Sequence, residues 1–198
     1  MGNPFDCEYR DHAFNVGRIT LSMSFAEVQI EHLLEFYLGE YSGRIVIKEL
    51  GRNRDKSHFL FRLMENCEED KEFVKAVQSC LAAYAIHREN RNKLVHAYAI
   101  FTEADGRTRW ERASGKANIP VATAEVDLNR LEVMIDELDV LNGELAFAMW
   151  FKAYQLGYTF FSGQAQTRRP ITVSLPAKFA DLSSEIIANS LTTLMKRT

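Results

Sequence analysis

Apolar side chains recur every three or four residues over much of the chain, which predicts amphipathic helices. The first clear run follows Ser24, which forms a capping-box pattern with Glu27. Its inward positions are Ile30, Leu33, Leu34 and Tyr37, while Glu27, Glu31 and Glu35 alternate outward as a solvated face. This helix is expected to end near Gly43. Residues 1–22 show little periodicity and are expected to form an irregular lead-in.

Two shorter patterns follow and predict a second and a third helix. Asp55 is expected to begin a helix that extends to about Glu65, with Phe59, Leu60 and Leu63 inward. A third helix is expected from about Glu69 to about Glu89, and its apolar face comprises Phe73, Val77, Cys80, Leu81 and Tyr84. The stretch IVIKEL at 45–50 is short, and its pattern does not distinguish a helix from a strand.

After residue 97 the spacing of apolar residues changes to the alternation typical of strands. The sequence YAIFTEADGRTRWER at 98–112 has Asp105-Gly106 at its centre, which is a strong signal for a two-residue hairpin turn. Such a turn places Phe101 opposite Trp110. A loop at 114–120 precedes a long helix that is capped by Thr123 or Asp127 and ends near Gly157. Its inward face comprises Leu131, Met134, Leu138, Leu141, Leu145 and Met149.

Together these elements predict an all-α fold, an antiparallel helical bundle with a small β-hairpin insertion at about 99–113. The expected organisation is an N-terminal arm at 1–23, a helical domain at 24–157 and a C-terminal extension at 158–198, which holds a short helix from about 180.

Composition narrows the class of protein. Of the 198 residues, 46% are hydrophobic and 26% are charged, as in an ordinary globular domain that buries a core. The net charge of −3 argues against a protein that coats long nucleic acid. Three cysteines without C-x-x-C spacing favour reduced thiols in a cytoplasmic protein. The most apolar window contains Lys152 and is interpreted as a buried helix end, so no membrane partner is expected.

The candidate chemistry lies in ENRNKLVHAY at 89–98. On a continuous helix, Arg91 and His96 point about 140° apart, because 3.6 residues make one turn. Asparagine is a favoured N-cap, so we expect the third helix to stop near Glu89 and a new one to begin at Asn92. That break would allow the arginine, the amide and the imidazole to converge. The hypothesis of a shared site depends on it.

These residue types suit phosphodiester chemistry. The imidazole of His96 titrates near neutral pH and can transfer protons, and the guanidinium of Arg91 can hold phosphate oxygens. His87 and Arg88 are interpreted as a solvated helix end, although Arg88 and Lys93 would add positive charge beside a phosphate. No acidic cluster with metal-ligand spacing accompanies them, so the expected route uses neither a metal nor another cofactor.

The segment RNKLVHAY resembles the signature of HEPN domains, in which an arginine and a polar residue precede a histidine. The likeness covers roughly residues 24–156. It implies a metal-independent endoribonuclease in which two protomers place their motifs in one cleft and leave 2′,3′-cyclic phosphate and 5′-hydroxyl ends. The resemblance implies that His96 is the acid/base, that Arg91 holds the charged phosphorane and that Asn92 assists.

Many members of that family are toxins or defence effectors. In one branch the motif extends to a tyrosine that a partner nucleotidyltransferase antitoxin adenylylates, and Tyr98 matches that position. The resemblance therefore implies a homodimer, an RNA substrate and an antitoxin partner. In the alternative interpretation, Tyr98 packs beside Phe101 and Trp110.

A different class of function stays open. The chain would then be a catalytically silent HEPN-like module, a dimer scaffold that binds a protein or a nucleotide. In that case His96 is a hydrogen-bonded structural histidine, and Arg91 pairs with Glu89 or a carbonyl at a helix end. A second match to the loose motif, Arg52 to His58, is interpreted as coincidental because it lies in a polar segment between helices.

Overall fold

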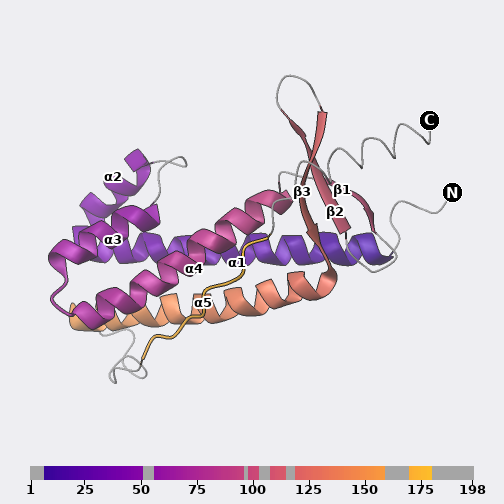
Figure 1. Cartoon of the computed structure of the whole chain (residues 1–198). Helices are drawn as coiled ribbons and strands as arrows, with labels where there is room; N and C mark the ends of the chain where they lie inside the picture. The colour runs from indigo at the N-terminus through magenta and orange to yellow at the C-terminus, as the bar shows by residue number, and fades with distance from the viewer. Residues whose placement is uncertain are drawn as a thin grey trace, which may run out of the picture. The chain divides into compact units, whose positions relative to one another are not determined.

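The computed structural model describes residues 7–50, 56–95, 98–102, 108–114, 119–158 and 170–179, with the backbone alone at 7–9, 40 and 98–125. Five helices account for most of these residues, so the prediction of a mainly helical chain is confirmed (Figure 1). The helices are α1 (Cys7–Leu38), α2 (Glu40–Leu50), α3 (Lys56–Cys67), α4 (Lys71–Val95) and α5 (Leu128–Gln155). The strands are β1 (Tyr98–Thr102), β2 (Thr108–Ser114) and β3 (Ile119–Val126).

The chain divides into two compact units. Unit 1 comprises Met1–Thr20, Arg88–Ile135 and Ala177–Thr198, and unit 2 comprises Leu21–His87 and Asp136–Pro176. The helices α1, α4 and α5 each contribute residues to both units.

Unit 2 is built on the predicted apolar faces. Its fully buried side chains include those of Ile30, Leu33, Leu34, Leu60, Val77, Cys80, Leu138, Leu141 and Leu145. Between α4 and α5, the rings of Phe73 and Phe151 lie 5.3 Å apart. The α1 carboxylates of Glu27 and Glu31, expected to face only solvent, instead both accept hydrogen bonds from Lys56 Nζ of α3. Side-chain pairing thus supplements the apolar contacts that hold this unit together.

The first seventeen residues of α1 correct the sequence analysis. An irregular lead-in was expected up to residue 22, yet α1 begins at Cys7 and passes through Ser24 without a new start. The buried positions His12, Asn15 and Ile19 continue the spacing of three and four residues toward the core. Because the first two of these are polar, apolar periodicity alone does not reveal the helix.

The turn between α1 and α2 depends on two glycines. Helix α1 ends at Leu38, earlier than the predicted Gly43, because Gly39 adopts a left-handed φ of 79° that a side chain disfavours. The stretch at 45–50 is helical, in α2. There Gly43 packs so closely against α1 that an added Cβ would lie 2.7 Å from the Cα of Glu35.

We expect Gly43→Ala to destabilise the protein by about 1 kcal/mol or more. In a helix this change normally stabilises by about 1 kcal/mol, but overpacking costs about 1–3 kcal/mol, and here the clash is with backbone. Gly143→Ala in α5 is the matched control, since nothing lies within 4 Å of its added Cβ. Thermal unfolding of both variants checks the prediction. A Tm that rises equally in both would contradict it.

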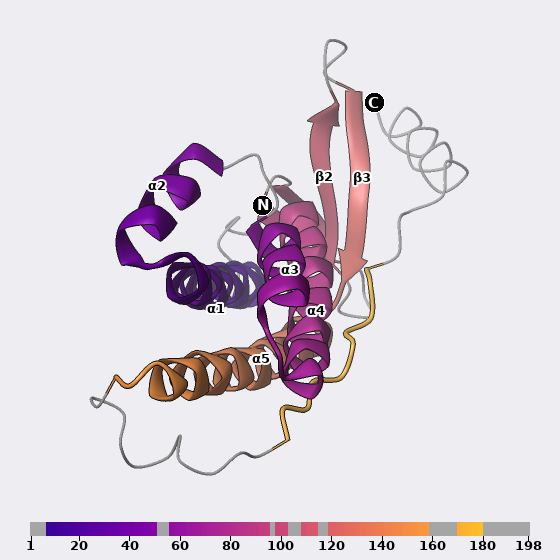
Figure 2. The same cartoon turned by 90° about the vertical axis from the view of Figure 1, so that its left-hand side faces the viewer.

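Unit 1 contains a three-stranded antiparallel sheet in the order β1-β2-β3. Figure 2 shows β2 and β3 side by side and running in opposite directions. The predicted pairing of Phe101 with Trp110 is wrong, because Phe101 pairs with Arg109 across an irregularity. The residues paired next to the turn, Thr102 and Thr108, have five residues between them. That odd number does not fit a two-residue turn with regular pairing. Residues 103–107, which include the predicted turn, lie outside the described residues.

Strand β3 was not expected, since residues 114–120 were interpreted as a loop and Thr123 as one of two helix caps. Proline is disfavoured in a central strand, but β3 is at the edge of the sheet, where Pro120 is tolerated. Of the two candidate caps, Thr123 and Asp127, it is Asp127 that caps α5. Its carboxylate accepts a hydrogen bond from the backbone N–H of Arg130 at 2.7 Å. Helix α5 then runs to Gln155, close to the predicted end.

Candidate functional site

The predicted break in the motif helix is absent. Helix α4 runs without interruption from Lys71 to Val95, so Asn92 is an exposed residue near the end of a helix and not an N-cap. The helix continues because His87, Asn90 and Leu94 extend its buried face, with 1%, 0% and 0% of their areas exposed. His87 was expected at a solvated helix end, and this too was wrong. As in α1, polar residues on the buried face concealed the periodicity.

Of the three proposed catalytic residues, Arg91 and Asn92 are the ones whose side chains the structure describes. Arg91 is half-buried, and its Nε is buried without a hydrogen-bond partner among the described residues. Asn92, the next residue, is exposed. A buried donor without an acceptor has lost its hydrogen bond to water, which lowers the stability of the fold unless a ligand supplies an acceptor. The structure thus places an unsatisfied guanidinium nitrogen in the last two turns of α4.

The other half of the motif is only partly described. His96 and Ala97 lie outside the described residues, between the end of α4 and the start of β1. Tyr98 begins β1, and its side chain is not described, so adenylylation at this position stays a prediction. Because the break expected at Asn92 is absent, convergence of Arg91 and His96 requires a change of backbone direction after Val95, in residues that the structure does not describe.

The two cations expected to support a phosphate have different surroundings. Arg88 is half-buried on α4. Lys93 has 14% of its side chain exposed, and its Nζ donates a hydrogen bond at 2.7 Å to the backbone carbonyl of Phe179. The same Nζ lies 3.9 Å from Glu89 Oε1. Lys93 therefore binds the chain's own C-terminal segment, and a phosphate would have to compete for it.

Asn90 is the polar residue of this region that the sequence analysis missed. Its Nδ2 donates to the carbonyl of Ala177 at 3.0 Å, and its Oδ1 accepts from the N–H of Phe179 at 2.8 Å. Both hydrogen-bonding groups of a fully buried amide are thus satisfied by backbone two residues apart. The spacing Tyr84, His87, Asn90, Leu94 was the available signal, because it extends the predicted face of the third helix.

Comparison of the chain with protein-family models, with curated proteins and with solved structures finds no match. Its function therefore has to be argued from its own residues.

A separate polar cluster lies in unit 2 around Glu68, which is 7% exposed. Its Oε2 accepts a hydrogen bond from Lys152 Nζ at 2.6 Å and another from the Tyr37 hydroxyl at 2.6 Å. Lys152 also lies 4.6 Å from the centre of the Tyr37 ring. This cluster links α1, the residues before α4 and the last turn of α5.

The electrostatics of this cluster favour a structural role. Burial opposes ionisation of Glu68, but hydrogen bonds from Lys152, Tyr37 and the N–H of Asp70 outweigh it and lower the pKa of that carboxyl. Burial and the adjacent carboxylate raise the pKa of Tyr37 far above its usual value. Near neutral pH the carboxylate is ionised and the phenol keeps its proton, so neither is matched to acid–base catalysis there.

Three further findings concern chemistry elsewhere in the described residues. Burial raises the pKa of the Cys80 thiol to about 12, so it is not a nucleophile near neutral pH. No group of three or more histidine, cysteine, aspartate or glutamate side chains in the described part of the chain is placed to hold a metal ion. Among the described helices, none combines the length and apolarity needed to cross a bilayer.

Unit 2 also has an apolar cavity of about 370 Å³ between α4 and α5. It is lined by Glu72, Phe73, Ala76, Phe147, Phe151, Pro170 and Ile171. Among the described residues that line it, Glu72 supplies the one polar side chain, an exposed carboxylate. The cavity lacks the convergent polar groups that would fix the orientation of a ligand.

Proposed function

We propose that the chain is a HEPN-like helical domain that acts as a metal-independent endoribonuclease, in a homodimer whose two motifs share one cleft. In this proposal β1 to β3 are an insertion between the motif helix and the last long helix. His96 is the acid/base, Arg91 holds the charged phosphate and Asn92 assists. The resemblance of RNKLVHAY to the family signature underlies the proposal.

The observation that carries it is the state of Arg91. Its Nε is buried and makes no hydrogen bond within the described part of the chain, and the adjacent Asn92 is exposed. If Arg91 were only a helix-end cation, it would be expected to pair with a carbonyl or with the carboxylate of Glu89. That carboxylate instead lies 2.8 Å from Lys178 and 3.9 Å from Lys93. A phosphate oxygen that reached this nitrogen would supply the acceptor that Nε lacks among the described residues.

We expect the purified protein to cleave a short single-stranded RNA in the presence of EDTA. The reaction uses the RNA's own 2′-hydroxyl as nucleophile, so no bound metal is needed to generate one. Mass spectrometry of the products should find 2′,3′-cyclic phosphate and 5′-hydroxyl ends. Cleavage that requires Mg²⁺, or that leaves 5′-phosphate ends, would contradict the proposed mechanism.

A second candidate is a catalytically silent HEPN-like scaffold, and one observation favours it. Helix α4 runs through Asn92 without the expected break, and its side chains Asn90 and Lys93 donate hydrogen bonds to the backbone of residues 177–179. Such contacts are those of a structural element. A folded, dimeric protein that leaves RNA intact under all metal conditions would favour the scaffold.

A further inference from the structure

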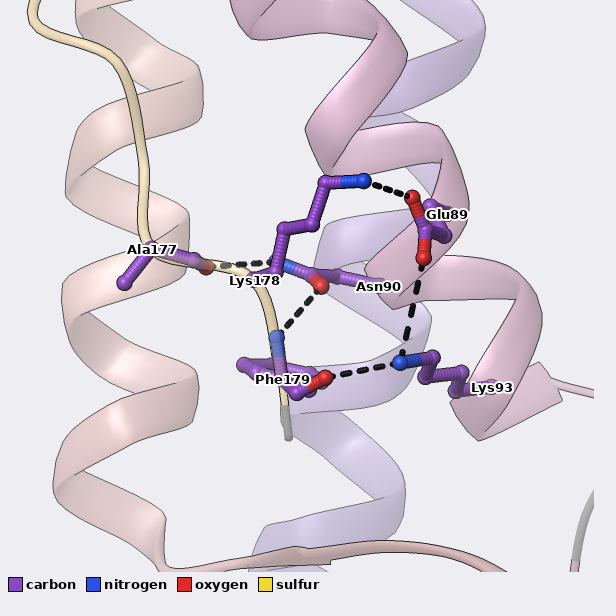
Figure 3. A network of polar contacts seen from close by, with 6 residues as sticks. All are labelled: Glu89, Asn90, Lys93, Ala177, Lys178 and Phe179. Atoms are coloured by element: carbon purple, nitrogen blue, oxygen red, sulfur yellow. Dashed lines mark hydrogen bonds and ion pairs between the residues drawn. The ribbon is translucent and has the colours of Figure 1, made fainter. Parts of the chain in front are cut away.

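The most elaborate polar arrangement of unit 1 holds a short piece of the chain's own C-terminal region. Figure 3 shows Ala177, Lys178 and Phe179 lying along the side of α4, with Asn90 reaching to the segment. The segment has neither helical nor strand structure. Four side chains contact it, from two helices: Glu89, Asn90 and Lys93 of α4 and Arg130 of α5.

Most of these contacts are made to the backbone. Asn90 binds the carbonyl of residue 177 and the N–H of residue 179. Lys93 donates to the carbonyl of residue 179, and Arg130 Nη2 donates to that of residue 177 at 3.1 Å. A side-chain amide that joins a carbonyl and an N–H two residues apart makes the same bonds as a neighbouring strand. Recognition through strand-like backbone bonds accepts an extended peptide largely irrespective of its sequence.

Two contacts add selectivity for side chains. The Lys178 ammonium lies 2.8 Å from Glu89 Oε2. Phe179 is only 6% exposed. The Arg130 guanidinium lies 5.7 Å from the centre of its ring, within cation–π range. A lysine followed by an aromatic residue therefore fits the charge and the shape of this surface.

We propose that Glu89, Asn90, Lys93 and Arg130 form a recognition site for an extended peptide with a lysine–aromatic pair, which Ala177–Phe179 fills as an exchangeable internal ligand. The same segment of a second copy of this chain is the partner that fits in trans. Asn90 is fully buried with both of its hydrogen-bonding groups in use, so the site is built around backbone recognition. The proposal stands whether or not the chain cleaves RNA.

The test uses a labelled synthetic peptide of residues 173–182, VSLPAKFADL, and full-length protein. In the unmodified chain the internal segment competes at a high effective concentration, of the order of millimolar. Phe179→Ser in the full chain weakens that internal ligand. We expect this variant to bind the peptide at least tenfold more tightly than the unmodified chain does, as measured by fluorescence anisotropy.

Two matched variants locate the binding. Adding Asn90→Ala to the Phe179→Ser chain should weaken peptide binding at least tenfold. Adding Glu89→Lys should shift preference severalfold toward a peptide in which Lys178 is replaced by glutamate. Absence of saturable binding, or equal binding of a scrambled peptide, would overturn the proposal.

Hydrogen exchange provides a measurement that needs no substitution. In the unmodified chain the Phe179 N–H donates to Asn90 and should exchange slowly. Excess peptide should displace the internal segment and accelerate exchange at residues 177–179. Unchanged exchange at saturating peptide would equally overturn the proposal.

Discussion

Replacing Lys152 by methionine is expected to lower the free energy of unfolding by about 3 kcal/mol or more. The Lys152 side chain is 13% exposed and that of Glu68 is 7% exposed, so the pair is largely removed from water. Methionine keeps most of the volume and removes the charge, which leaves the carboxylate buried with only Tyr37 and a backbone N–H as donors. Removing one partner of a buried ion pair typically costs about 3–5 kcal/mol. Urea denaturation measures the change.

The double variant Lys152→Met, Glu68→Gln is the control. With both charges removed, no ion is left buried without its partner, and most of the lost stability should return. Arg62→Ala is a surface control, because its ion pair with Glu65 is exposed on α3 and should contribute less than about 1 kcal/mol. A double variant no more stable than the single one would contradict this account of the cluster.

The pH dependence of the same variants follows from the direction of the Glu68 shift. The folded-state pKa of Glu68 lies below its unfolded value, so its ionisation stabilises the fold above that unfolded value of about 4.3. This contribution is lost as the pH falls through the folded pKa. In Lys152→Met the unpaired, buried carboxylate should have a raised pKa instead. The stability deficit of that variant should therefore shrink on acidification.

The sequence predicted those helices whose buried faces are apolar. The faces of α4 up to Tyr84 and of α5 up to Leu145 are buried as expected, and the end of α5 near Gly157 was placed within two residues. Hydrophobic burial drives these contacts, so apolar periodicity is sufficient to find them.

The errors have a common physical cause. The start of α1 and the end of α4 bury polar residues, namely His12, Asn15, His87 and Asn90, which periodicity counts as outward-facing. Whether such a residue is buried depends on a distant hydrogen-bond partner. For Asn90 that partner lies about 90 residues away in the chain, at Phe179, and no local pattern reports it. Because the burial of Asn90 was not recognised, the helix was expected to end near Glu89 and Asn92 was interpreted as the cap of a new one.

His96→Ala is expected to reduce RNA cleavage about 100-fold or more, since a positioned acid/base typically contributes 10²–10⁴-fold. Arg91→Ala should reduce cleavage strongly as well, because the charge that holds the phosphate is lost. Its effect on stability is expected to be separate from that on cleavage, because the substitution removes no hydrogen bond between Nε and a described residue. Single-turnover cleavage in EDTA and thermal unfolding of each variant separate the two effects.

His58→Ala is the matched control, because His58 ends the other motif match and is exposed near the start of α3. It should leave cleavage unchanged. Arg91→Lys distinguishes charge from geometry, as lysine keeps the charge but cannot form two parallel hydrogen bonds with a phosphate. A partial loss in Arg91→Lys and a full loss in Arg91→Ala would indicate direct contact with the reacting phosphate. Cleavage that survives His96→Ala but is lost in His58→Ala would assign the chemistry to the start of α3 instead.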